Sequence, residues 1–418
     1  MNLKRVVITG LGAVTPIGNN VSDYWNSLLT GVNGVNLITR FDTELYKTKF
    51  ACELKGFDVL DYLDNKEARK MDPCSHYAIA ATAEAIADSQ LDLSKTDLER
   101  FGVILGTGIG GIISVSAGFH DFFAQDKNPR FISPFFIPKV LGDITAGIIS
   151  IKYGLKGPNY ATTSACASSG NAIADAFHLI QLGKATMMLT GGTEAPIVDL
   201  GLGGFIAMHA LSTRNDDFLT ASRPFDKDRD GFVMGEGAGV LLLEEYENAR
   251  ARGAKIYAEL LAVGLTADAF HITSPPANGE GAYNSMKLAI VDAQLNTTDI
   301  DHINTHGTST PAGDIAECNA IANLFGEHAP KMVINSTKSM TGHLLGAAAA
   351  VEAIATILAL KEGVIPPTIN QFNRDPAINP NWNLADNKAV KRDINTAICN
   401  SFGFGGHNST LVFAPYRP

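Results

Sequence analysis

Short apolar segments, most of them bounded by glycine, alternate along the chain with alanine- and isoleucine-rich stretches of helical length, and this alternation limits the folds available to it. The segments predicted as strands are residues 6–9, 103–106, 187–190, 240–243, 303–305, 332–335 and 397–400. The stretches predicted as helices include residues 77–87, 144–153, 172–182 and 347–360. Strands that alternate with helices predict an α/β fold with layered sheets. The last two helical stretches are apolar nearly all round, which predicts central helices covered on both sides.

The chain has 418 residues, which is enough for two domains or for two halves that share one core. Its one polar, flexible-looking junction is ARARGAKI at residues 249–256, so we expect a first half at residues 1–252 and a second at residues 253–418. The segments FGVILGTGIGG and ICNSFGFGGHN resemble each other across this boundary. That likeness gives slight support to a duplication.

Composition excludes several classes of protein. The net charge of −10 argues against a general nucleic-acid-binding surface. The longest apolar run, residues 344–360, is interrupted by Glu352 and predicts a buried helix rather than a membrane span. The N-terminus lacks the long apolar core of a secretory signal. Five widely spaced cysteines, with no CxxC pair, favour reduced thiols in a cytoplasm over a disulfide scaffold or a zinc site.

Cys166 stands out because it is surrounded by small residues in TTSACASSG. The segment before it is β-prone and the segment after it is helix-compatible, which predicts a strand-to-helix turn. The partial positive charge of a helix N-terminus favours a thiolate, and its free N–H groups can bind an oxyanion. Buried inert cysteines are also common, and position alone leaves both interpretations open.

The second half offers partners for a nucleophilic sulfur. His306 follows a predicted strand, and Lys338 and His343 precede the alanine-rich helix that carries Glu352. An unpaired charge in an apolar helix is costly, so we expect a cation beside Glu352, with Lys338 as the candidate.

Asp314 and Glu317 lie three residues apart on one helix face and are candidates to orient His306 or Lys338. An ordinary solvated helix face is the alternative for this pair of carboxylates.

Three familiar motifs are imitated without being completed. GTGIGG at residues 106–111 has dinucleotide-binding spacing but no acidic residue in a following strand, which argues against NAD. DKDRDGFVMGEG at residues 226–237 imitates a calcium loop but has glycine at the twelfth position. His302 and His306 lack the glutamate of a zinc protease.

With these residues assembled, the chain resembles the β-ketoacyl-acyl-carrier-protein synthases, condensing enzymes of the thiolase-fold superfamily, and most of all the synthase II type. The likeness extends over nearly the whole chain, in the order VVITGLGAVTPIG, FGVILGTGIGG, TTSACASSG, ALSTRND, RPFDKDRDGFVMGEGAG, THGTSTPAGD, STKSMTGHLLGAA and NSFGFGGHN. It implies a five-layered αβαβα sandwich of two pseudo-duplicated halves that pairs as a homodimer.

The resemblance also implies roles for individual residues. Cys166 resembles the acylated nucleophile, His306 and His343 the paired histidines, and Lys338 the active-site lysine with Glu352 as its partner. Phe404 resembles the gating residue whose N–H joins that of Cys166 in the oxyanion hole. The other matching positions are Thr308 and Thr310 for the pantetheine arm, Ile109 for the acyl tunnel, and Lys66, Arg69 and Lys70 for the acidic carrier protein.

The implied activity is an acyltransferase reaction: decarboxylative condensation of malonyl-carrier with an acyl group on Cys166, extending the chain by two carbons. It requires no metal or diffusible cofactor, because substrates arrive on the carrier's phosphopantetheine. Rival interpretations are a thiolase with Cys399 as second cysteine, a chain-length-factor-like partner, and an NAD-binding module. Acyl-chain preference, the pathway served and any bound monovalent ion stay open.

Overall fold

The structure is a computed structural model that describes residues 3–417. In this range ten strands form one sheet, five from each half of the chain. The first half contributes β1 (Val6–Val14), β4 (Phe101–Gly106), β5 (Asn159–Thr162), β6 (Met187–Glu194) and β7 (Gly237–Glu245). The second contributes β8 (Ala258–Ala267), β9 (His302–Asn304), β10 (Val333–Asn335), β13 (Ala397–Gly403) and β14 (His407–Ala414).

The two halves repeat one topology. The strand order β5-β4-β6-β7-β1 in the first half corresponds to β10-β9-β13-β14-β8 in the second. Parallel and antiparallel pairings occur at the same places in both: the three strands from the outer end are parallel, and the remaining pairs are antiparallel. The halves join where β1 pairs with β8, from Val6 opposite Leu260 to Ile8 opposite Ala258. The slight sequence signal of a duplication therefore corresponds to a repeat in the structure.

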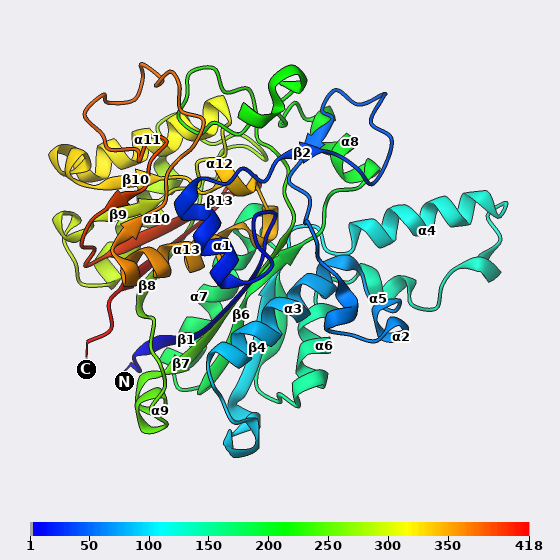
Figure 1. Cartoon of the computed structure of the whole chain (residues 1–418). Helices are drawn as coiled ribbons and strands as arrows, with labels where there is room; N and C mark the ends of the chain where they lie inside the picture. The colour runs from blue at the N-terminus through cyan, green and yellow to red at the C-terminus, as the bar shows by residue number, and fades with distance from the viewer. Residues whose placement is uncertain (1–2, 418) are drawn as a thin grey trace.

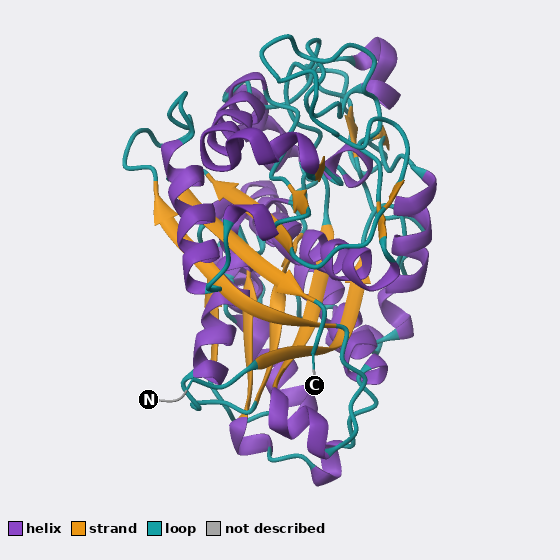
Figure 2. Ribbon diagram, turned by 90° about the vertical axis from the view of Figure 1, so that its left-hand side faces the viewer, coloured by secondary structure: helices purple, strands orange, loops and turns teal. Residues whose placement is uncertain are grey.

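Helices complete a five-layered arrangement. α7 (Ser168–Gln181) and α13 (Ala348–Glu362) contact strands of both halves and form the middle layer. α3 (Pro73–Asp88) and α6 (Ile144–Tyr153) cover the outer face of the first half, and α10 (Glu280–Asp292) and α11 (Pro311–Phe325) cover the second. Figures 1 and 2 show helices on either side of the strands. The expected αβαβα sandwich is confirmed, with the two sheets joined into one by hydrogen bonds.

Shorter elements decorate this frame. They are α1 (Val21–Thr30), β2 (Asn36–Leu37), β3 (Phe50–Ala51), α2 (Asn65–Ala68), α4 (Ile112–Ala124), α5 (Phe136–Val140), α8 (Asp199–Ala207), α9 (Tyr246–Ala251), α12 (Lys338–Thr341), β11 (Val364–Ile365) and β12 (Val390–Lys391). α4 projects from the body of the first half (Figure 1). None of the helices within residues 3–417 is both long and apolar enough to cross a membrane.

Local sequence signals explain where the main helices begin and end. Asp72 caps α3 by accepting the N–H of Cys74, and Pro73 occupies the first turn, where no N–H donor is needed. Gly363 caps the C-terminus of α13, and its φ of 63° suits glycine. Gly106 allows the close approach that positions the site, because a Cβ there would lie 2.3 Å from the backbone carbon of Ser168 in the first turn of α7.

The predicted boundary at residue 252 falls between the last strand of the first half, β7, and the first strand of the second, β8. It stays a prediction, because the strands alone do not define two separate folding units.

Candidate active site

Cys166 lies in a 3-10 turn, Ala165–Ala167, between β5 and α7, as the sequence predicts. Ser168 fixes this turn: its hydroxyl accepts the N–H of Ser164 at 2.9 Å and donates to the carbonyl of Ala165 at 2.6 Å. From the second half, the Ser401 hydroxyl donates to the carbonyl of Cys166 at 2.9 Å. The cysteine is therefore held by both halves and is 6% exposed.

One cavity of about 350 Å³ is lined by Cys166, His306, His343 and Phe404. The rings of His306 and His343 meet edge to face, with centroids 5.3 Å apart. His306 follows β9 and His343 follows α12, so the rings come from the second half while the sulfur comes from the first. The structure thus brings these four predicted residues to one place.

Burial determines the charge state of the two imidazoles. It lowers the pKa of His306 and of His343 well below the usual range, and the nearby Lys338 ammonium lowers both further. Both ring nitrogens of His343, and Nδ1 of His306, are buried without a hydrogen-bond partner among the described residues. Neutral rings with unused nitrogens can donate hydrogen bonds to an anion that develops in the cavity.

Lys338 and Glu352 form a buried ion pair, and each side chain is 1% exposed. The cation that the sequence requires beside Glu352 is therefore present. Burial raises the pKa of Glu352 to about 7, and Lys338 acts against that rise. Lys338 is not among the cavity-lining residues of the described chain, so it acts on the site through its charge.

The resting state of Cys166 differs from the expectation of a thiolate at a helix mouth. Burial raises the pKa of the thiol to about 12, although Lys338 and the N–H groups of Phe404 and Cys166 itself lower it. The effect of burial on the pKa of Cys166 is larger than the opposing effect of the helix N-terminus, so the sulfur is a protonated thiol at neutral pH. The same two N–H groups are the predicted oxyanion donors, and both act on the sulfur.

The two candidate orienting carboxylates separate in the structure. Glu317 accepts the backbone N–H of His306 at 2.9 Å and of Gly307 at 2.8 Å, so it holds the histidine through its main chain. Asp314 contacts neither His306 nor Lys338 by a hydrogen bond or ion pair among the described residues. It pairs with Arg229 and accepts the N–H of Ser309 at 3.1 Å. Asp314 thus holds the turn after His306 rather than a catalytic side chain.

Comparison with known proteins identifies the family. The model of the β-ketoacyl synthase N-terminal domain matches residues 3–249, and that of the C-terminal domain matches residues 257–372. The chain belongs to the β-ketoacyl synthase family. It is 50% identical over 414 residues to 3-oxoacyl-[acyl-carrier-protein] synthase 2 of Staphylococcus aureus (strain COL), covering 99% of each chain.

Solved structures agree with this membership. A β-ketoacyl synthase from Burkholderia phymatum STM815 matches with a TM-score of 0.90 at 37% identity, covering 99% of this chain and all of the other. AntDE:AntF, a type II PKS acyl-carrier protein in complex with its ketosynthase bound to the hexaketide, matches with a TM-score of 0.92 at 33% identity, again covering 99% and 100%. The thiolase-like fold expected from the sequence is therefore shown.

The remaining residues suggested by the synthase family lie in different places. Thr308 and Thr310 line the cavity, and their hydroxyls are hydrogen-bonded at 2.9 Å. Ile109 lies between β4 and α4, is 42% exposed, and is not among the cavity-lining residues of the described range. Its tunnel role stays a prediction. Lys66, Arg69 and Lys70 lie in and just after α2, the first two exposed and the third half-buried, and their carrier-binding role also stays a prediction.

Cys399, the second cysteine of the thiolase interpretation, is buried on β13. It is not one of the cavity-lining residues within the described range 3–417. Burial raises the pKa of its thiol, and the charge of Glu352 raises it further. A base must reach the reacting carbon, so Cys399 is not placed to serve as one.

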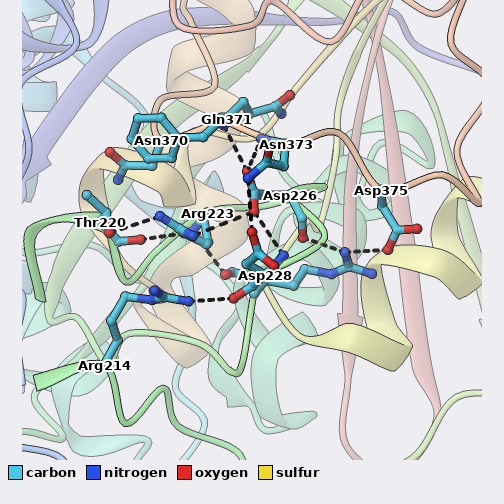
Figure 3. A network of polar contacts seen from close by, with 12 residues as sticks. Arg214, Thr220, Arg223, Asp226, Asp228, Asn370, Gln371, Asn373 and Asp375 are labelled. Carbon is cyan, nitrogen blue, oxygen red and sulfur yellow. Dashed lines mark hydrogen bonds and ion pairs between the residues drawn. The ribbon is translucent and has the colours of Figure 1, made fainter. Parts of the chain in front are cut away.

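The calcium-like motif has a function that the sequence did not reveal. Asp226 accepts the N–H of Phe372 and of Asn373, and Arg229 donates to Asp375 at 2.8 Å. Figure 3 shows Asp226 beside Asn373, with Asp375 at the edge of the same network. Arg229 also donates to the carbonyl of Thr310 at 3.2 Å. The motif is thus a polar network that joins the two halves beside the threonines. Only the acidic spacing was visible in the sequence, since the partners lie some 80 to 150 residues away.

Proposed function

We propose that the protein is a 3-oxoacyl-[acyl-carrier-protein] synthase of type 2, which extends fatty acyl chains by two carbons through decarboxylative condensation. The observation that carries the proposal is the meeting of Cys166 with two neutral imidazoles in one cavity. The relative from Staphylococcus aureus that bears the name of this activity, 50% identical over 99% of the chain, supports the proposal.

In the first step an acyl group moves from the carrier's pantetheine to Cys166. The thiol loses its proton and attacks the thioester carbonyl, whose oxygen becomes an oxyanion held by the N–H groups of Cys166 and Phe404. When the tetrahedral intermediate collapses, the pantetheine sulfur leaves and takes up the proton that the Cys166 thiol lost. Because the resting sulfur is protonated, this proton transfer contributes to the barrier.

In the second step malonyl-carrier loses CO₂. The electron pair of the broken carbon–carbon bond forms an enolate, and His306 and His343 donate hydrogen bonds to its oxygen. The enolate carbon attacks the acyl carbonyl on Cys166, the sulfur leaves as a thiolate, and a 3-oxoacyl-carrier two carbons longer is released. The low pKa values of His306 and His343 favour this step, because a neutral imidazole donates a hydrogen bond to the enolate oxygen without transferring its proton to the enolate.

The substrates bring their own reactive groups, so the proposed chemistry uses no cofactor. We assign Thr308 and Thr310 to the pantetheine arm because their paired hydroxyls lie on the cavity wall. Lys66, Arg69 and Lys70 are proposed as the docking patch for an acidic acyl carrier protein, since opposite charges steer association. The ketosynthase–carrier complex AntDE:AntF supports a carrier partner for this family.

We also propose that the protein works as a homodimer. β5 is an edge strand with exposed residues at Asn159 and Tyr160. The α4–α5 arm, which follows β4, the strand paired with β5, exposes large apolar side chains at Phe119, Phe123 and Ile137, with exposed fractions of 53 to 60%. An open edge beside apolar surface fits a second copy of the chain. Ile109, at the base of this arm, would then be covered by the partner.

The five cysteines, all buried and free of disulfides in the described residues, fit the proposed cytoplasmic location.

The test is product analysis. The purified protein is incubated with acyl-carriers of several lengths and malonyl-carrier, and the products are identified by mass. We expect 3-oxoacyl-carriers two carbons longer than each accepted substrate, together with CO₂, and no such product from Cys166→Ala. Condensation without CO₂ release from malonyl-carrier, or no condensation at all with the wild type, would contradict the proposal.

A further inference from the structure

Glu194, at the end of β6, carries a fully buried carboxylate that the proposed mechanism does not use. No ion pair found among residues 3–417 includes it. Its two oxygens instead accept hydrogen bonds from one hydroxyl and four backbone N–H groups. Oε1 accepts from the Thr107 hydroxyl and the N–H groups of Ile109 and Gly110 at 3.0 to 3.3 Å, and Oε2 accepts from the N–H groups of Gly108 at 2.6 Å and Gly346 at 2.9 Å.

Gly346 is the counterpart of Cys166 in the repeated fold. Each is the middle residue of a 3-10 turn at the N-terminus of a central helix. The turns are Ala165–Ala167 before α7, here called the first helix mouth, and Leu345–Ala347 before α13, the second helix mouth. Each follows a residue with positive φ, 50° at Ala165 and 47° at Leu345. In the second mouth, therefore, a resident carboxylate binds the N–H that corresponds to the oxyanion donor of the first. Helix N-termini favour anions at this place.

The carboxylate also joins segments that border the cavity. Leu345 and His343, just before Gly346, line the cavity. Gly108, bonded to the same oxygen, lies against the turn of Cys166, since a Cβ on Gly108 would be 3.3 Å from the carbonyl oxygen of Ala165. Glu194 therefore sits where the turn that carries the sulfur crosses the turn that follows the histidine.

We propose that Glu194 is a positioning residue: its carboxylate, hydrogen-bonded in the second helix mouth, fixes the segment of His343 against the turn of Cys166. The inference rests on the proposed roles of Cys166 and His343. It assigns to Glu194 no contact with substrate, and it predicts a larger effect on decarboxylation, which needs His343 in register, than on the reactivity of the thiol.

Burial raises the pKa of Glu194, and the N–H and hydroxyl groups that donate to its carboxylate oppose that rise. The charge that these donors stabilise provides a second readout. Two charged side chains act on the sulfur: Lys338 lowers the pKa of Cys166 and Glu194 raises it. The ionisable residues that line the same cavity are His209, Asp268, His271, His306, Glu317 and His343. Removing the negative charge of Glu194 should therefore lower the pKa of Cys166 and make its alkylation faster at a given pH. A residue with only a structural role would not move this profile in that direction.

The key variant is Glu194→Gln. In either orientation of the amide, its NH₂ group faces at least two groups that now donate hydrogen bonds to Glu194. Because two donors cannot hydrogen-bond each other, the contacts on that side of the side chain must separate. We expect CO₂ release from malonyl-carrier to fall by about 10²-fold, the scale for a misplaced catalytic group, while alkylation of Cys166 by iodoacetamide shifts to lower pH. Glu194→Asp keeps the charge and should keep the wild-type alkylation profile, with an intermediate loss of CO₂ release.

Thr107→Val is the matched control, because it removes one donor and leaves the carboxylate and its four N–H partners. Its loss of CO₂ release should be well below that of Glu194→Gln. Circular dichroism and thermal melting check that each variant is folded. Wild-type CO₂ release by folded Glu194→Gln would overturn the proposal. So would failure of both Glu194 variants to fold, since the residue would then act on stability alone. If Cys166→Ala stayed active, the proposed function would fail instead, which separates the two ideas.

Discussion

The mouths of the two central helices share a backbone and differ in what their N–H groups bind. In front of α7 the turn carries Cys166 and opens into the cavity. In front of α13 the equivalent turn carries Gly346, and the Glu194 carboxylate occupies its N–H group. In the proposed reaction the first mouth is free to bind an oxyanion, whereas the second already holds the Glu194 carboxylate.

This difference shows how a duplicated scaffold can divide one reaction between its copies. The half that does not carry Cys166 provides both histidines and the Lys338–Glu352 pair. Since sulfur and imidazoles come from different halves, neither half holds the complete constellation. Placing the same small change in the two mouths should therefore have different consequences, and the following experiments rank those consequences from the largest.

Alanine in the first mouth should abolish catalysis and spare the fold. Cys166→Ala removes the sulfur that we propose as the carrier of the acyl group, so condensation should fall by at least about 10³-fold. The site has small neighbours and the change leaves the backbone intact, so the melting temperature should stay close to that of the wild type. Condensation is measured by product mass. The matched control is Cys399→Ala, which should keep most of the activity; the reverse ranking of the two variants would favour the thiolase interpretation.

Removing a ring of the second half should separate the two steps. His306→Ala or His343→Ala should still form acyl-enzyme, since the proposed acyl transfer uses the sulfur of Cys166 and two backbone N–H groups. Release of CO₂ from malonyl-carrier should fall by roughly 10²- to 10³-fold, the scale for losing a donor to a developing anion. Radiolabelled acyl-enzyme and CO₂ are measured in parallel. Unchanged CO₂ release by both variants would remove the histidines from the decarboxylation step.

Alanine in the second mouth should harm the fold first. A Cβ on Gly346 would lie 2.2 Å from the N of Gly108 and 2.5 Å from Oε2 of Glu194. We expect Gly346→Ala to lower the free energy of unfolding by about 1–3 kcal/mol, as overpacking does. Denaturant unfolding measures it. Gly147→Ala in α6 is the control, because a Cβ there meets nothing within 4 Å and should stabilise the helix by about 0.5–1 kcal/mol. Equal stability of the two variants would show that the second mouth is not tightly closed.

The smallest effect concerns pH. Burial raises the pKa of Cys166 to about 12, so the thiolate fraction at neutral pH is lower than for an exposed thiol. The rate of alkylation by iodoacetamide should therefore keep rising through pH 9, by about tenfold per pH unit below the pKa. Peptide mass spectrometry after timed quenching measures it. A plateau below pH 8 would mean that the helix mouth and Lys338 prevail over burial.

Much of the frame could be predicted from sequence because its signals are local. Residues 144–153 are predicted and observed as a helix, since their apolar run ends at Gly154, which has the positive φ of a helix stop. The apolar-run criterion does not detect β8 or β14, whose residues mix small, polar and apolar side chains. Those strands are stabilised by pairing with each other and by the pairing of β8 with β1.

The candidate site likewise has features that could be predicted from the sequence and features that could not. The need of Glu352 for a cation follows from the cost of burying a charge in an apolar helix, and Lys338 meets it. The contacts of Glu194 and Arg229 could not be predicted, because the partners that define their roles lie some 80 to 150 residues away in sequence. Nor could the neutral state of the Cys166 thiol, since desolvation depends on the whole surrounding fold.

The account depends on a covalent acyl group at the first helix mouth that is consumed with help from the second half. The direct measurement is peptide mass spectrometry of the wild-type protein after incubation with acyl-carrier, before and after addition of malonyl-carrier. We predict one acyl adduct on the peptide that contains Cys166, which disappears as CO₂ and the extended product form. An adduct on another residue, or one on Cys166 that persists when malonyl-carrier is consumed, would contradict it.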